Sequence, residues 1–166
     1  MAFLGCDCLK NITASPRGMD TFSLGVADMS WETKIEDGAF QRCTSLVGIT
    51  IPESVTEIGN WVFSGCSNLN NVAIPSSVRV IGSMAFLGCT SLENIAIPSS
   101  VNAIKDGAFQ GCSSLYSIVI PPSITEIESG TFQGCSCLRN ISIPSSVREI
   151  GDGAFQACSN LTTVSL

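Results

Sequence analysis

The sequence has no histidine and few charged residues, and these shortages narrow the range of functions open to it. Its 166 residues include 8 lysines and arginines, 14 aspartates and glutamates, and 13% charged residues in all. Without histidine, a Ser-His-Asp or Cys-His catalytic site, a histidine metal ligand and a histidine pH switch are excluded. The net charge of −6 opposes nucleic-acid binding, which requires clustered basic residues.

Long apolar runs are also missing. No stretch reaches the roughly 18 consecutive apolar residues that a membrane-spanning helix needs, so no membrane insertion is predicted. The opening segment Met1–Cys6 is apolar, but it is too short for a signal peptide and no basic stretch precedes it. The apolar share of 45% is ordinary for a globular protein, and the length suits a single domain.

A 23-residue repeat dominates what is present. An isoleucine recurs at this spacing in six units, and we count it as position 1: Ile35, Ile58, Ile81, Ile104, Ile127 and Ile150. In all six units position 6 is phenylalanine, position 9 is cysteine, position 12 is leucine and position 15 is isoleucine or valine. One such unit cannot bury its apolar side chains alone, whereas stacked units merge them into a continuous core. The repeat therefore predicts a solenoid.

Within each unit the pattern predicts short extended segments. Leu46–Ile51 ends in a period-2 alternation rich in β-branched residues, which is typical of a strand, and Pro52 ends it. A second, shorter extended piece is expected at Val55–Ile58. Gly107–Cys112 and its equivalents suit a single helical or 3₁₀ turn. The predicted fold is thus a β-rich α/β solenoid, in which equivalent strands pair in parallel about 4.8 Å apart.

Two regions are expected along the chain. Residues 35–166 form six repeats, of which the last is truncated, and residues 1–34 form a partial repeat followed by an irregular segment. Met1–Ile12 closely matches Met84–Ile95, so the chain opens inside a repeat. The alternation at 22–26 predicts a further strand, and Trp31 is expected to shield the first regular repeat. Since neither end shows a polar capping repeat, we expect a piece of a longer array or ends covered by a partner.

The consensus of the repeat is Ile-Pro-x-Ser-Val-x-x-Ile-Gly-x-x-Ala-Phe-x-x-Cys-x-x-Leu-x-x-Ile-x-Ile. It closely resembles the BspA-like leucine-rich repeat family, over residues 35–166 in register and residues 1–12 in part. The resemblance implies a right-handed leucine-rich-repeat superhelix, with a parallel sheet on its concave side and short helical or 3₁₀ turns on its convex side. It also implies frequent occurrence in surface-exposed or secreted proteins, some of which are adhesins. The family shares no catalytic residues, so no enzyme is expected.

Nine cysteines are present, and seven of them, including Cys6, occupy position 9. A column fixed by the repeat predicts buried thiols that act as small core residues. Cys8 and Cys137 instead give Cys-x-Cys spacings, whereas a redox or zinc site favours Cys-x-x-Cys. No metal and no cofactor are therefore predicted. Free thiols favour a reducing compartment while the resemblance favours the cell surface, so the location stays open.

Recognition is expected at the columns that vary between repeats. Positions 14 and 16 should face outward with small neutral side chains, among them Asn71, Asn94 and Asn140. Position 13 is the most diverse column, and its residues Glu93, Tyr116 and Arg139 bring together types that are frequent in binding hot spots. We take these three as the preferred contact cluster. The alternatives are that position 13 shows ordinary surface variation and that the small residues merely allow close stacking.

A second candidate lies at position 4, which is glycine in four of the regular repeats. Two adjacent repeats carry Trp61 and Met84 there, and Leu87 follows three residues after Met84. Together these residues are expected to form an exposed apolar patch of the kind that marks interaction sites. The alternative is that they pack locally over a wider turn.

The leading functional hypothesis is a non-catalytic protein-interaction module that serves as a surface adhesion or ligand-recognition domain for a protein partner. The alternative is a structural scaffold, part of a longer repeat array, that associates end to end through its open core columns. An enzyme or a metal protein is the third hypothesis, and it finds no support in the residue types present.

Overall fold

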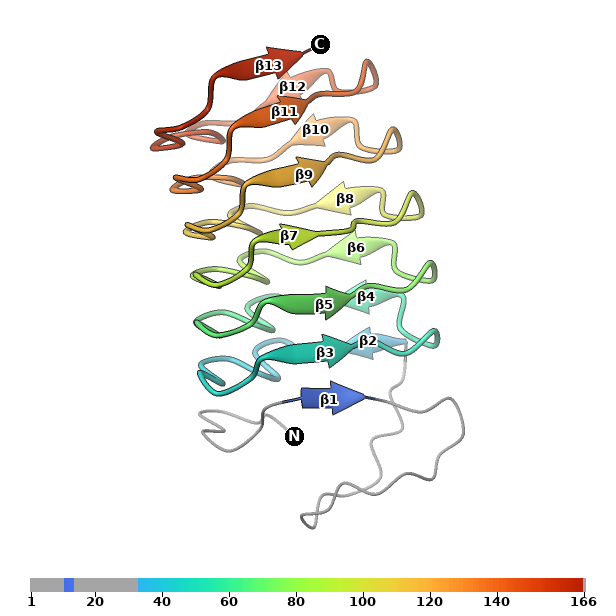
Figure 1. The fold of residues 1–166 in the computed structure, drawn as a ribbon. Helices are drawn as coiled ribbons and strands as arrows, with labels where there is room; N and C mark the ends of the chain where they lie inside the picture. Colours follow the sequence, from blue (N-terminus) through green and yellow to red (C-terminus); the bar gives the residue numbers. More distant parts are fainter. Residues whose placement is uncertain (1–10, 14–32, 166) are drawn as a thin grey trace.

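The computed structural model describes residues 11–13 and 33–165, which wind into a stack of flattened coils with a strand on each side (Figure 1). The front sheet contains β1 (Asn11–Thr13), β3 (Gly48–Thr50), β5 (Asn71–Ala73), β7 (Asn94–Ile95), β9 (Ser117–Val119), β11 (Asn140–Ser142) and β13 (Thr163–Ser165). The back sheet contains β2 (Lys34–Ile35), β4 (Glu57–Ile58), β6 (Val80–Ile81), β8 (Ala103–Ile104), β10 (Glu126–Ile127) and β12 (Glu149–Ile150).

All the paired strands run in parallel, one repeat apart and in register. Ile58 lies opposite Ile81 in the back sheet, and Ile49 lies opposite Val72 in the front sheet. The front ladder is interrupted between β5 and β7, and the back ladder between β8 and β10. Strand β1 pairs with β3, which places Ile12 opposite Ile49. The predicted parallel solenoid is therefore confirmed. The strand predicted at 22–26 and the shielding contact predicted for Trp31 lie outside the described residues.

The prediction of a helical or 3₁₀ turn at position 4 to position 9 is wrong, since residues 33–165 contain no helix. In Gly107–Cys112, three amides donate to the carbonyl three residues earlier: Ala108 to Lys105 O (3.0 Å), Gln110 to Gly107 O (2.9 Å) and Cys112 to Phe109 O (3.2 Å). The amides that alternate with these donate to the next coil: Gly107 to Ser129 O (2.9 Å), Phe109 to Thr131 O (2.9 Å) and Gly111 to Gln133 O (2.7 Å). A helix needs all of these amides for its own carbonyls, so the stacking of coils prevents one.

This alternation depends on a left-handed backbone at positions 4 and 8 of each regular repeat, where φ lies between 54° and 75°. Glycine adopts such angles without steric penalty, which explains its frequency in both columns. Four non-glycine residues also take this conformation, namely Arg42, Trp61, Met84 and Ala157. Each of these positions carries an unfavourable backbone term of about 1–2 kcal/mol.

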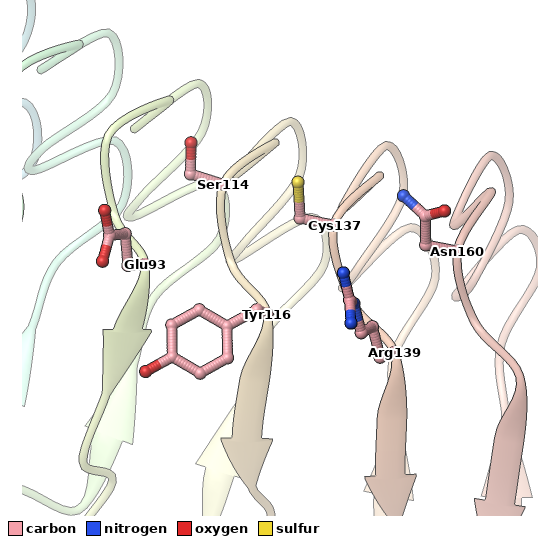
Figure 2. Close-up of a pocket in the computed structure, with 6 residues that line it drawn as sticks. All are labelled: Glu93, Ser114, Tyr116, Cys137, Arg139 and Asn160. Carbon is pink, nitrogen blue, oxygen red and sulfur yellow. The ribbon is translucent and has the colours of Figure 1, made fainter.

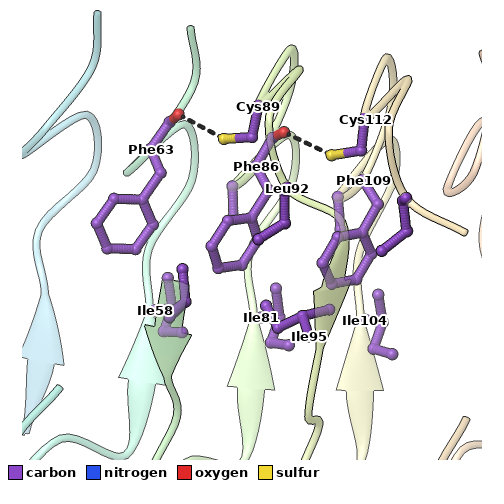
Figure 3. Packing of buried hydrophobic residues seen from close by; sticks show 14 of the residues in the cluster. Ile58, Phe63, Ile81, Phe86, Cys89, Leu92, Ile95, Ile104, Phe109 and Cys112 are labelled. Atoms are coloured by element: carbon purple, nitrogen blue, oxygen red, sulfur yellow. Dashed lines mark hydrogen bonds between the residues drawn. The ribbon is translucent and has the colours of Figure 1, made fainter. Parts of the chain in front are cut away.

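The core between the two sheets is built from columns of identical side chains (Figure 3). The six phenylalanines of position 6 form one continuous stack, with ring centroids 5.2–5.8 Å apart and interplanar angles of 3–20°. Stacked aromatic pairs contribute about 0.5–1.5 kcal/mol each beyond the burial of their area. The stack therefore stabilises the contact between one coil and the next.

The cysteine column is buried, as predicted, and it also forms hydrogen bonds that the sequence did not reveal. Five thiols, those of Cys66, Cys89, Cys112, Cys135 and Cys158, donate to the carbonyl of the phenylalanine 26 residues earlier, with Sγ–O distances of 3.0–3.2 Å. Figure 3 shows two of these bonds. Phe63 O also accepts the amide of Cys66 at 3.0 Å, so this carbonyl uses both of its lone pairs.

Burial disfavours the thiolate form of the five hydrogen-bonded cysteines. Desolvation raises the pKa of Cys66 and of Cys135 to about 12, and it raises the pKa of Cys89 and Cys112 well above the usual value of 9.0. The pKa of Cys158 is raised for the same reason. These thiols are therefore protonated and unreactive near neutral pH.

Alkaline pH is expected to destabilise the solenoid. Below about pH 9 the thiols are protonated in both states, whereas between pH 9 and about pH 12 they ionise only in the unfolded chain. The free energy of unfolding should then fall by about 1.4 kcal/mol per pH unit for each such thiol. Urea unfolding across this range measures the slope. Cys112→Ser keeps a hydrogen-bond donor but has no ionisable thiol, so the slope of its unfolding free energy against pH should be smaller by about 1.4 kcal/mol per pH unit. An unchanged slope would contradict the raised pKa of Cys112.

Candidate interaction surface

A pocket of about 440 Å³ opens at the beginning of the front-sheet strands, across four consecutive repeats (Figure 2). Two columns line it. Position 13 supplies Glu93, Tyr116 and Arg139, and position 11 supplies Ser114, Cys137 and Asn160. We call this feature the position-13 pocket.

The local structure explains why these side chains gather there. The position-12 leucines Leu115 and Leu138 are fully buried, so the residues on either side of them are directed outward. The amide of Tyr116 donates to Glu93 O (3.0 Å), and that of Arg139 donates to Tyr116 O (3.4 Å). These bonds hold the three position-13 residues side by side on adjacent coils, about 4.8 Å apart.

The structure thus brings together the three residues that the sequence analysis selected at position 13. The position-11 column was not among the predicted contact residues, and Cys137 was considered only as a metal or redox candidate. The signal was present in the repeat, because positions 11 and 13 flank one buried leucine and therefore share a face. Ser114 and Asn160 are the residues that this argument would have added.

Two opposite charges in the pocket have no partner of the opposite sign in the described part of the chain. Neither Glu93 nor Arg139 takes part in any of the ion pairs found there, which join Lys34 to Asp37 and Glu57, and Lys105 to Glu128. Two coil spacings, or roughly 10 Å, separate Glu93 from Arg139. The ring of Tyr116 lies between them, extends toward the strand of Glu93, and is 48% exposed (Figure 2).

Below the pocket the outer face of the front sheet carries mainly small side chains. Asn71, Asn94 and Asn140 are exposed there on β5, β7 and β11, outside the lining of the pocket. Val119 on β9 is 76% exposed, close in sequence to Tyr116. Val119 occupies position 16, a column predicted to carry small neutral side chains, and it is the most exposed large apolar residue in the described part of the chain.

The second predicted patch forms a contact of its own away from the pocket. The indole Nε1 of Trp61 donates to Sδ of Met84 at 3.1 Å, and Trp61 is 41% exposed. Leu87 is half-buried and occupies position 7, where other repeats carry glutamine or serine. Three of these glutamines form a ladder, in which Gln110 donates to Gln133 (2.8 Å) and Gln133 donates to Gln156 (2.7 Å). None of the three apolar residues lines the pocket.

Within residues 33–165 no group of three or more cysteine, aspartate or glutamate side chains is arranged to hold a metal ion. The same part of the chain contains no helix long and apolar enough to cross a membrane.

Comparison with known proteins identifies the repeat. A family model described as a BspA type leucine rich repeat region matches residues 33–162 in six copies. The chain belongs to this family. Leucine-rich repeat proteins of this kind are typically protein-interaction modules and are generally not enzymes.

Solved structures agree with this assignment. A leucine-rich repeat protein of T. pallidum is 37% identical, with a TM-score of 0.78, and the match covers 80% of this chain and 62% of that one. A leucine-rich repeat protein of Bacteroides ovatus is 33% identical, with a TM-score of 0.84, over 98% of this chain and 38% of that one. A leucine rich cell surface protein of Faecalibacterium prausnitzii is 30% identical, with a TM-score of 0.68, over 93% of this chain and 46% of that one. The chain spans less than two thirds of the length of each of these proteins. No curated protein matches the sequence.

Cys137 is expected to be the readily modified cysteine within residues 33–165. It is exposed in the pocket, whereas the other six described cysteines are buried. A short pulse of iodoacetamide at neutral pH, followed by peptide mass mapping, should label Cys137 and leave the position-9 cysteines unlabelled until urea unfolds the chain. Cys137→Ser provides the control. Equal labelling of the Cys112 peptide in the folded protein would contradict the buried column.

Proposed function

We propose that this chain is a non-catalytic protein-interaction module that binds a protein partner through the front sheet, with the position-13 pocket as its main contact. The observation that carries the proposal is the convergence of Glu93, Tyr116 and Arg139 on one pocket. Tyrosine and arginine are the residue types that dominate binding energy at many interfaces. The surrounding small residues of β7, β9 and β11 leave room for a partner to approach the sheet closely.

The proposed setting is the cell surface, where the chain would serve as an adhesion or ligand-recognition domain. The support is the family itself together with the relative from F. prausnitzii, which is described as a cell surface protein. A rigid solenoid suits this setting because it presents its variable side chains without a large loss of conformational entropy on binding.

End-to-end association as part of a scaffold is a second candidate. The last coil leaves two core positions incompletely covered, since Ile150 is 49% exposed and Val164 is 48% exposed. Strand β13 is the outer strand of its sheet piece, and an outer strand presents unpaired backbone groups to another strand. A further coil, from the same repeat array or from a second molecule, would cover both features.

The double substitution Tyr116→Ala with Arg139→Ala is expected to weaken partner binding by at least about thirtyfold, because truncating two hot-spot residues removes roughly 2 kcal/mol or more. The partner is first recovered with the intact chain, and its affinity is then measured by titration calorimetry.

The matched control is Asn70→Ala with Thr162→Ala. Both residues occupy position 13 and are exposed, but they lie outside the pocket lining, so binding should be retained. If the Tyr116 and Arg139 variant binds as tightly as the unchanged chain, the position-13 pocket is not the contact.

A further inference from the structure

The outer face of the front sheet carries a charge arrangement that its own chain does not use. Positions 13–16 of the six regular repeats contain two charged residues, Glu93 and Arg139. They lie one repeat before and one repeat after Tyr116, and neither forms an ion pair with another described residue. Each charge is therefore available to a group of opposite sign on a partner.

We infer that the partner of this face is a second copy of the same chain, packed face to face about a twofold axis parallel to β9; this inference rests on the function proposed above. Rotation about this axis reverses the order of the coils and keeps the direction of the strands. It places Tyr116 against Tyr116 of the second copy and Val119 against Val119. It also places Glu93 against Arg139 of the second copy, and Arg139 against its Glu93. Such self-complementarity is what a twofold interface requires.

The remaining residues of the face are compatible with the same rotation. Asn94 on β7 meets Asn140 of the second copy, and two carboxamides can each donate and accept a hydrogen bond. Asn71 meets Thr163, Ala96 meets Ser142, and Ser117 meets its own counterpart. No pair of like charges is opposed, and no charged residue faces an apolar one.

The distribution of polarity is also that of an interface. Tyr116 and Val119, which are 48% and 76% exposed, form an apolar centre at β9. Glu93 and Arg139 flank this centre, and small polar residues surround it. In protein interfaces an apolar centre with an aromatic anchor is enclosed by a polar rim. The carboxylate of Glu93 of the second copy would enter the position-13 pocket beside Cys137 and Asn160 (Figure 2).

The area of the face indicates how stable the dimer can be. With the axis at β9, the rotation opposes the five coils from β5 to β13, and β3 meets no described strand of the second copy. Five coils extend over roughly 24 Å, and the seven residues from position 11 to position 17 extend over roughly 20 Å. Each copy would therefore bury roughly 500 Å², or about 1,000 Å² in total, which is the size of a weak and transient interface. We expect a reversible dimer that dissociates on dilution.

Sedimentation velocity over a wide range of concentration tests the inference. The intact chain should shift from monomer to dimer as its concentration rises. Glu93→Arg alone and Arg139→Glu alone should each dimerise at least about tenfold more weakly, because each creates two like-charge contacts across the twofold axis. The double variant that exchanges the two charges restores both pairs and should dimerise again. Glu149→Arg and Arg148→Glu, which change the charge equally beside or within β12 of the back sheet, are the controls.

A mixture of the two single variants gives the sharpest test. Glu93→Arg and Arg139→Glu should each be monomeric alone, yet their equimolar mixture should form a heterodimer, since every arginine then faces a glutamate. Circular dichroism and thermal unfolding confirm that each variant is folded.

Three results would overturn the inference: an intact chain that stays monomeric at every concentration, a dimer that the charge reversals do not weaken, or a mixture that forms no heterodimer. The first result, combined with a different protein bound in a Tyr116-dependent manner, would leave the proposed interaction function intact. A dimer insensitive to the charges but weakened by Ile150→Glu would indicate end-to-end stacking instead.

Discussion

The structure depends on hydrogen bonds between backbone groups of neighbouring coils, about one repeat apart in the sequence. Alternate turn amides donate forward to the next coil, as from Phe109 to Thr131 O, while amides directly after the short back strands donate backward, as from Gly59 to Ile35 O. The backbone donors and acceptors of each coil therefore find many of their partners in the two neighbouring coils, as in other repeat proteins. The left-handed backbone at positions 4 and 8 orients the turn amides toward the next coil.

The repeat itself made most of the fold predictable. A fixed spacing identifies the side chains that share a column, and period-2 alternation around Ile49 and Ile118 identifies the front strands. The turn was mispredicted because Gly107–Cys112 has the composition of a helical turn when read alone. Its backbone groups are instead committed to the next coil, which is a tertiary effect that local sequence does not encode. The thiol-to-carbonyl bonds escaped prediction for the same reason, since the acceptor lies 26 residues away.

The surface was harder to predict than the core. Variation at position 13 selected Glu93, Tyr116 and Arg139, and these residues line one pocket because stacking in register brings equal positions together. Whether the position-13 residues line a pocket also depends on the side chains at position 11, two residues earlier in each repeat. Ser114 and Asn160 were therefore missed. At position 4 the sequence suggested a patch, but not the direct contact between Trp61 and Met84 or their left-handed backbones.

The separation of core columns from face columns has a consequence for how such a chain can diversify. Duplicating one whole coil between Tyr116 and Arg139 would preserve every buried column, since the new coil would bring its own phenylalanine, thiol and glycine-rich turn. The same duplication would move the guanidinium away from the ring by about 4.8 Å and change what the face can recognise. In this architecture new specificity can therefore arise by changing the number of coils, without a single substitution in the interior.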